Sequence, residues 1–290
     1  MFKNRNRKIV NKVVRNILKT EKLRNIITIL AIVISAVLFT SLTTLVNGTV
    51  RSQTMMMQMQ AGSKADAEVK GMTKSQYEML TKYSLIKEVG LRRSVTYLCN
   101  TKHHNVEINY LDKKAQDIFF SKPTHGNAPE KVNEVATSDK ALKDLGIDPK
   151  VGEKVRIEFQ LKGNPHKYSY EMVVSGWWEA TNEQSSLMLV SNQFMEQNRD
   201  LFENNRKYDF ELGRYSAELI LKNKRNIDDK LKREIRAIGG EPENQKAANF
   251  TPVVVNRIAS VEVKEVIVPI GLILLLFFLC NYLLIYNIFD

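Results

Sequence analysis

The chain has 290 residues, a mean hydropathy of −0.28 and a formal net charge of +11, which are the averages of an ordinary basic, soluble protein. These averages hide an uneven distribution. Apolar residues are concentrated near both ends, and nine basic residues precede residue 25, where Glu21 is the only acidic one. Because the remainder is only slightly basic, the charge argues against a nucleic-acid-binding protein. Cys99 and Cys280 lie in segments of different character, which excludes a disulfide scaffold.

Residues 1–25 predict a basic amphipathic helix on the cytoplasmic side of a membrane. Ile9, Val13 and Ile17 recur every four residues, with lysines and arginines between them. Such a helix lies at a membrane surface with its cations among anionic headgroups. The alternative is an unstructured basic arm. In either case the positive-inside rule places the N-terminus in the cytoplasm.

Two uncharged apolar segments, 26–46 and 266–288, predict two transmembrane helices. As helices they reach about 30 Å, the thickness of the hydrocarbon core, and a spanning segment must satisfy its own backbone hydrogen bonds. Two buried core helices are the alternative, although core helices seldom run so long without a charge. A cleaved signal peptide is a second alternative for 26–46, but the segment is too long and no small-x-small site follows it. We expect a multi-pass protein of the cell membrane with residues 47–265 outside.

Segments 47–61 and 254–265 are predicted to be stalks that connect the spans to an outer domain. No helix breaker occurs between Thr49 and Gln60, so the first helix is expected to continue until Gly62. This stalk contains a methionine-rich run, which either packs adaptably against a neighbour or is simply exposed. Segment 254–265 leads without a break into the second span. Two such stalks would couple the outer domain rigidly to the membrane.

Residues 62–253 predict an extracytoplasmic α+β domain, and the predicted fold class is a membrane protein with two transmembrane helices flanking a mixed α/β domain. Strand–helix–strand units occur at both ends, around a β-rich middle. The predicted strands are 65–70, 89–98, 106–110, 154–161, 168–179, 186–190 and 214–221. The predicted helices are 73–82, capped by Thr73, then 138–145, 192–198 and 227–238.

The outer domain contains no motif for catalysis or for a cofactor. The nearest approach to a phosphate loop, 146–154, has five residues between its glycines and Glu153 where a lysine is required. Cys99, His103 and His104 suggest a metal site, but adjacent histidines on a strand point to opposite faces, and a turn with exposed histidines is the simpler interpretation. No nucleophile elbow occurs. We predict no catalytic residue, no metal and no cofactor, and expect any ATP to bind another chain.

Three residues of segment 266–288 are candidates for helix packing or coupling. Pro269 and Gly271 interrupt a helix, and Asn281 is a polar residue in an apolar segment. Polar groups inside a membrane usually face other protein. The alternative is a mild kink and an amide that reaches the membrane surface.

Five segments together resemble FtsX-like ABC transporter permeases with a MacB-type periplasmic core domain. The first is VVRNILKTEKLRNIITILAIVIS (13–35), which resembles the amphipathic helix and first span of these proteins. The others are EVATSDKALKDLGIDPKVGEKVRIEF (134–159), YEMVVSGWWE (170–179), SSLMLVSNQFMEQN (185–198) and LLIYNIF (283–289), which resemble the core domain and the end of the second span. In 134–159 the family has a strand, a helix that begins with serine, and a V-G-[ED]-K-V turn into the next strand.

The resemblance implies a permease subunit that works as a homodimer, or as a heterodimer with a second permease, together with a cytoplasmic ABC-type ATPase. ATP hydrolysis would move the outer domain, which would handle a lipid, a lipopeptide or an antimicrobial peptide. Membrane lipid would be a further partner. Members of the family have at least two further spans, so we expect this chain to be the N-terminal part of such a permease.

Two other functional classes fit some of these features. A membrane receptor, such as the N-terminal part of a sensor kinase or chemoreceptor, also has two spans around an outer sensing domain. Additional apolar spans after residue 290 would favour the permease, whereas a charged signalling helix would favour the receptor. A membrane-anchored extracytoplasmic enzyme is disfavoured, because no catalytic set of residues is present.

Overall fold

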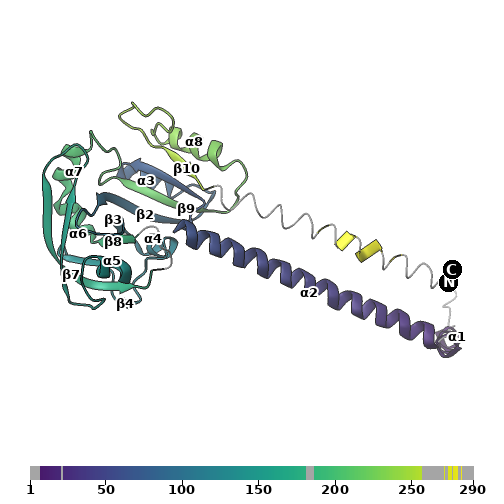
Figure 1. The fold of residues 1–290 in the computed structure, drawn as a ribbon. Helices are drawn as coiled ribbons and strands as arrows, with labels where there is room; N and C mark the ends of the chain where they lie inside the picture. The colour runs from purple at the N-terminus through teal and green to yellow at the C-terminus, as the bar shows by residue number, and fades with distance from the viewer. Residues whose placement is uncertain are drawn as a thin grey trace. The chain divides into compact units, whose positions relative to one another are not determined.

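The computed structural model describes residues 7–20, 22–180, 186–256, 271, 274, 275, 277–279 and 282. The chain divides into two compact units, which are described separately below. The first contains residues 1–54 and 261–290, and the second contains residues 55–260. Figure 1 shows the elements in chain order.

The first unit contains two helices, α1 (Arg7–Thr20) and most of α2 (Lys22–Ala61). The predicted amphipathic segment is helical rather than unstructured. Within the described residues one helical segment, Ile32–Ala61, has the length and apolar composition needed to cross a membrane. The described residues from 271 onward are also helical, and the Phe278 ring packs against Phe39 of α2 with a centroid distance of 5.8 Å.

Threonine hydroxyls inside α2 are satisfied by the helix itself. The Thr40 hydroxyl donates to the Ala36 carbonyl oxygen at 2.9 Å, and the Thr44 hydroxyl donates to the Thr40 carbonyl oxygen at 2.8 Å. An apolar helix can therefore carry these side chains without presenting an unpaired donor to its surroundings. The helix continues without interruption to Ala61, as predicted, and ends at Gly62, whose φ is +72°.

The second unit contains one ten-stranded sheet and six short helices within the described residues. The strands are β1 (Ala67–Met72), β2 (Ile86–Tyr97), β3 (Val106–Leu111), β4 (His125–Gly126), β5 (Glu134–Ser138), β6 (Lys154–Gln160), β7 (Lys167–Trp178), β8 (Ser186–Val190), β9 (Tyr215–Leu221) and β10 (Val253–Val255). The helices are α3 (Lys74–Leu80), α4 (Lys113–Ile118), α5 (Asp139–Asp144), α6 (Asn192–Gln197), α7 (Arg199–Asn205) and α8 (Ile227–Ala237).

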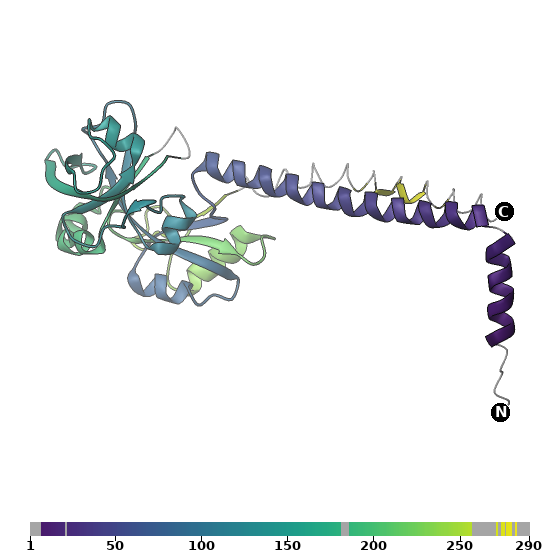
Figure 2. The same cartoon turned by 90° about the horizontal axis from the view of Figure 1, so that it is seen from below.

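The first lobe of this unit is a four-stranded antiparallel sheet with two helices. Its strand order is β10-β1-β9-β2, and β1-α3-β2 and β9-α8-β10 are its two strand–helix–strand units. This is the ferredoxin-like β-α-β-β-α-β arrangement. Apolar residues of α3 and α8, among them Leu80 and Leu231, share one core with alternate residues of β1 and β9. Figure 2 shows this lobe beside the second one.

The second lobe is inserted between β2 and β9, at the point where a ferredoxin-like fold has a hairpin. The long strand β2 belongs to both lobes, since it pairs with β9 over Ile86–Arg92 and with β3 over Arg92–Tyr97. The sheet continues as β3-β8-β5-β7-β4, and β6 pairs with β7. Its core contains the buried rings of Phe159, Phe194 and Phe202.

The strands and helices predicted between residues 62 and 253 are confirmed, with ends that differ by at most three residues. Thr73 caps α3 as predicted, and its side chain forms a capping box with Gln76. Helices α4 and α7 and strands β4 and β10 were not predicted as elements, and β5 was expected only through the family resemblance. The unpredicted helices have six and seven residues, too few for an apolar period to be recognised.

One predicted boundary is wrong. Residues 254 and 255 were assigned to the second stalk, but they belong to strand β10, which pairs with β1. Three consecutive valines favour a strand, and the free edge of β1 supplies the backbone partners. The remainder of the predicted stalk, from residue 257, lies outside the described residues, as does most of the predicted span 266–288.

Candidate functional site

The chain enters and leaves the second unit at neighbouring points. Strand β1, the first of the unit, pairs antiparallel with β10, the last, and Ala67 lies opposite Val255. The Asn256 N–H donates to the Asp66 carbonyl oxygen at 2.9 Å. A displacement of either chain end therefore acts on the same edge of the sheet.

Asp66 connects this edge to the interior of the first lobe. The residue is 3% exposed, and its backbone N–H donates to the Leu219 carbonyl oxygen at 2.8 Å. Its carboxylate accepts the Leu221 N–H at 2.9 Å and pairs with Lys224 Nζ at 2.5 Å. Two residues earlier, the Lys64 N–H donates to the Ile118 carbonyl oxygen of α4 at 2.9 Å. We call this set of contacts the Asp66 junction.

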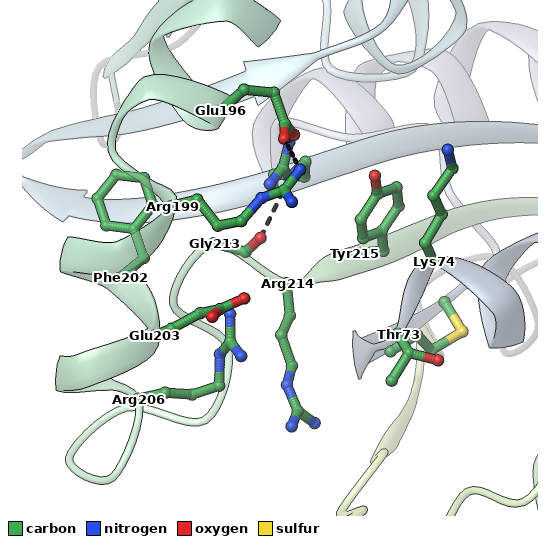
Figure 3. A pocket seen from close by; sticks show the side chains of 12 residues that line it. Thr73, Lys74, Glu196, Arg199, Phe202, Glu203, Arg206, Gly213, Arg214 and Tyr215 are labelled. Carbon is green, nitrogen blue, oxygen red and sulfur yellow. Dashed lines mark hydrogen bonds and ion pairs between the residues drawn. The ribbon is translucent and has the colours of Figure 1, made fainter.

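A pocket of about 290 Å³ lies between the two lobes (Figure 3). The first lobe contributes residues at the end of β1, the start of α3 and the start of β9, and the second lobe contributes one face of α6 and α7. Five cationic side chains but only two carboxylates line it. They are Lys74, Arg93, Arg199, Arg206 and Arg214, against Glu196 and Glu203. The pocket therefore has an excess of positive charge.

On one side of this pocket, Arg93 is held by bonds to neighbouring residues. Its guanidinium donates from Nε to the Gly213 carbonyl oxygen at 3.1 Å and from Nη1 to Glu196 Oε1 at 2.7 Å, and it lies 5.0 Å from the centroid of the Tyr215 ring. Arg199 pairs with the same Glu196. Burial alone would raise the pKa of Glu196, but the bonds from the two arginines outweigh it and lower the pKa. On this side of the pocket the charge of Glu196 therefore partly neutralises the charges of Arg93 and Arg199.

Arg206 and Arg214 form the other side and have no carboxylate bound to them within the described chain. Arg206 Nε donates to the Leu212 carbonyl oxygen at 3.3 Å, and Arg214 Nη1 donates to the Gly71 carbonyl oxygen at 2.9 Å. Burial lowers the pKa of Arg214. Burial, and then the charge of Arg214, lowers the pKa of Arg206 as well. In Figure 3 the Arg206 side chain extends toward Glu203, and the Arg214 side chain extends in a different direction.

A second charged cluster lies on β1, β2 and β9. Arg92 contacts Glu68, lies 3.3 Å from Glu218 Oε1 and 4.0 Å from Glu211 Oε2, while Lys70 pairs with Glu68 and Glu211. Glu218 is 2% exposed. Burial raises the pKa of Glu218 to about 7, although the charges of Arg92 and Lys70 oppose this change. Glu218 is therefore a buried carboxyl that titrates near neutral pH.

The suggested metal residues instead form a hydrogen-bonded turn. The buried carboxylate of Asp144 accepts the backbone N–H groups of Lys102, His103 and His104 at 3.0 to 3.2 Å, and His103 Nδ1 lies 2.9 Å from its Oδ1. Burial alone would raise the pKa of Asp144, but these bonds outweigh it and lower the pKa to about 2. Cys99 is exposed and free. Within the described ranges no three His, Cys, Asp or Glu residues are grouped to hold a metal ion.

The three candidates of the predicted second span are mostly not placed. Pro269 and Asn281 lie outside the described residues, and Gly271 is helical and exposed. The arginine pocket was not predicted from the sequence. Arg199 and Arg206 are seven residues apart, two turns of helix, and this spacing was a usable signal once α7 had been recognised. Nothing in the sequence indicates that Arg214 joins them.

Several solved structures match the chain at low TM-score, whereas no protein-family model and no curated protein sequence matches it. The periplasmic region of MacB from Actinobacillus actinomycetemcomitans has a TM-score of 0.42 and 12% identity, over 71% of this chain and 94% of that one. The extracellular domain of the noncanonic ABC-type transporter YknZ from Gram-positive bacteria has a TM-score of 0.36 and 14% identity, over 63% and 89%. A domain of a protein described as a permease, from Porphyromonas gingivalis, has a TM-score of 0.37 and 12% identity, over 66% and 88%.

Proposed function

We propose that this chain is a permease subunit of an ABC transporter whose outer domain is moved by ATP hydrolysis on a separate cytoplasmic ATPase. The observation that carries the proposal is the pairing of β1 with β10. One membrane helix precedes β1, and the proposed second one comes after β10. Both would therefore act on one edge of one sheet, and their relative movement would be transmitted directly to the domain.

Two further features support this function. The apolar helix α2 continues without a break to Ala61, and Asp66 lies only five residues beyond its end. A continuous helix is a stiff connection, whereas a flexible linker would absorb the movement. The ordered set of sequence segments that resembles FtsX-like permeases is the second feature.

The proposal includes a topology and partners. The N-terminus is cytoplasmic, residues 26–46 and 266–288 span the cell membrane, and residues 47–265 are extracytoplasmic. The partners are a cytoplasmic ABC-type ATPase, membrane lipid, and a second permease subunit in a homodimer or heterodimer. The outer domain handles a lipid, a lipopeptide or an antimicrobial peptide.

Purification of the full-length protein from its native membranes tests the partnership. It is expected to recover an ATPase whose rate of hydrolysis rises when the permease is present. Recovery without any ATPase, or with an ATPase that is indifferent to the permease, would contradict the proposal. Recovery of a kinase would support the receptor alternative instead.

A spin label on Cys99 tests the movement. Cys99 is exposed, and a Cys280→Ser background leaves it as the single cysteine of the chain. In a homodimer the distance between two labels is expected to change when ATP is added to the complex. Three residues inserted after Gly62 should abolish this change, because they interrupt the connection between α2 and β1. The same insertion after Gln245, in an exposed turn, should leave it intact.

A further inference from the structure

Arg206 and Arg214 have hydrogen-bonding capacity that the described residues do not use. A guanidinium carries five N–H donors. Each of these two arginines makes one hydrogen bond, to a backbone carbonyl oxygen, whereas Arg93 and Arg199 on the other side of the pocket are both bound to Glu196. Most donors of Arg206 and Arg214 are therefore available to a ligand.

Holding two such charges together is unfavourable unless an anion joins them. Both side chains are half-buried, so part of their hydration is lost. The two cations also repel each other, as the lowered pKa of Arg206 indicates. Glu203 on α7 is exposed and only partly compensates Arg206. Perturbed charged groups that face a pocket are frequent at binding sites.

We propose that this pocket binds a phosphate-bearing polar group, held by the guanidinium groups of Arg206 and Arg214. The arginine fork matches phosphate oxygens in pairs, and a phosphate monoester carries a charge of about −1.5 to −2 that can neutralise both arginines. A carboxylate carries a single charge and would leave one arginine uncompensated. This inference goes beyond the permease function and does not depend on it.

The dimensions of the pocket limit the ligand. Ligand pockets usually have volumes of about 300 to 1,000 Å³, so a pocket of about 290 Å³ accepts a phosphate with a small polar substituent. An acyl chain or a folded peptide would not fit. The same chemistry is available from a soluble phosphorylated compound and from the exposed headgroup of a lipid that ends in a phosphate monoester.

Titration with glycerol 3-phosphate tests the soluble source. The full chain in detergent micelles is titrated in a calorimeter, with sodium chloride at matched ionic strength as the reference. The wild type is expected to bind saturably, and the Arg206→Gln/Arg214→Gln variant to bind at least about tenfold more weakly, since charge-assisted hydrogen bonds are lost. The matched control Arg225→Gln/Arg233→Gln removes two exposed arginines outside the pocket and should bind like the wild type.

Nanodiscs test the lipid source. The thermal unfolding midpoint of the full chain is measured in phosphatidylcholine discs with and without phosphatidic acid, whose headgroup is a phosphate monoester. If a headgroup occupies the pocket, phosphatidic acid raises the midpoint of the wild type and of the control variant, but not that of Arg206→Gln/Arg214→Gln. Comparison of the variants separates this effect from the attraction of the basic N-terminal arm to anionic lipid.

Each result of these two experiments either supports the proposal or overturns it. Binding in either arm that requires Arg206 and Arg214 supports the proposal and identifies the source. Absence of saturable binding and of a lipid-dependent shift in the wild type overturns it, as does an equal loss in the control variant. If the glutamine variant does not fold, Arg206→Lys/Arg214→Lys decides. It keeps the charges without the planar forks, and an affinity equal to that of the wild type overturns the proposal.

Discussion

Replacement of Asp66 by alanine tests whether this carboxylate holds the two chain ends of the second unit against the sheet. In the wild type the carboxylate accepts the Leu221 N–H and pairs with Lys224. Alanine removes both contacts. Since Leu221 is 4% exposed, water has little access to the donor that is left behind.

The magnitude follows from these two contacts. A buried donor without a partner costs about 1–3 kcal/mol. The Lys224 side chain is 46% exposed, so loss of its ion pair adds at most about 1 kcal/mol. We expect Asp66→Ala to destabilise the junction by about 2–3 kcal/mol. Asp66→Asn keeps an oxygen acceptor for the Leu221 N–H and should cost only about 1 kcal/mol.

Hydrogen exchange followed by mass spectrometry measures this effect in the full chain in detergent. A loss of about 2 kcal/mol corresponds to exchange about 30-fold faster in peptides that cover β1 and the end of β9. Asp148→Ala, which removes an exposed aspartate far along the chain, is the control and should leave the rate unchanged. Unchanged protection in Asp66→Ala, or equal effects of alanine and asparagine, would refute the role assigned to the carboxylate.

Three further changes test other parts of the fold by thermal unfolding of the full chain. The pKa of Glu218 is raised from 4.5 to about 7, so the folded state binds this proton more tightly, and the associated stability is complete below pH 4.5 and is lost as the pH rises through 7. Glu218→Gln should remove this dependence, which amounts to at most about 3 kcal/mol. Gly90→Ala should destabilise by about 1–3 kcal/mol, because an added Cβ would lie 2.7 Å from backbone atoms of Ala115 in α4. Thr73→Ala should cost about 1 kcal/mol, because the capping box with Gln76 is lost.

One outcome would contradict the Glu218 prediction, and the other two variants have controls with contrasting expectations. A profile for Glu218→Gln that still falls between pH 4.5 and 7 would mean that another group titrates. Gly48→Ala lies in a helix with open space around the added carbon and should be neutral or slightly stabilising, unlike Gly90→Ala. Thr73→Ser keeps the capping oxygen, and a loss as large as that of Thr73→Ala would contradict the capping argument.

Features that depend on neighbouring residues were predictable from the sequence. The cap at Thr73 and alternating apolar residues place most helices and strands within a few residues of their observed ends, and the structure adds caps at Ser138 and Ser191. The long apolar helix was equally predictable, because its signal is a run of uncharged residues. Short elements such as β10 were missed, since Val254 and Val255 were assigned to the start of the second stalk.

The sequence by itself determined the local elements, the uneven distribution of apolar residues and charge, and the α+β character of residues 62–253. Tertiary structure alone decided which strands pair and which side chains line the same pocket. Strands β2 and β9 pair although more than a hundred residues separate them, and Arg206 and Arg214 meet in one pocket from a helix end and a strand start. The reason is physical: period and capping reflect interactions within a few residues, whereas strand order and converging charges depend on contacts between distant segments, which leave no periodic signal in the chain.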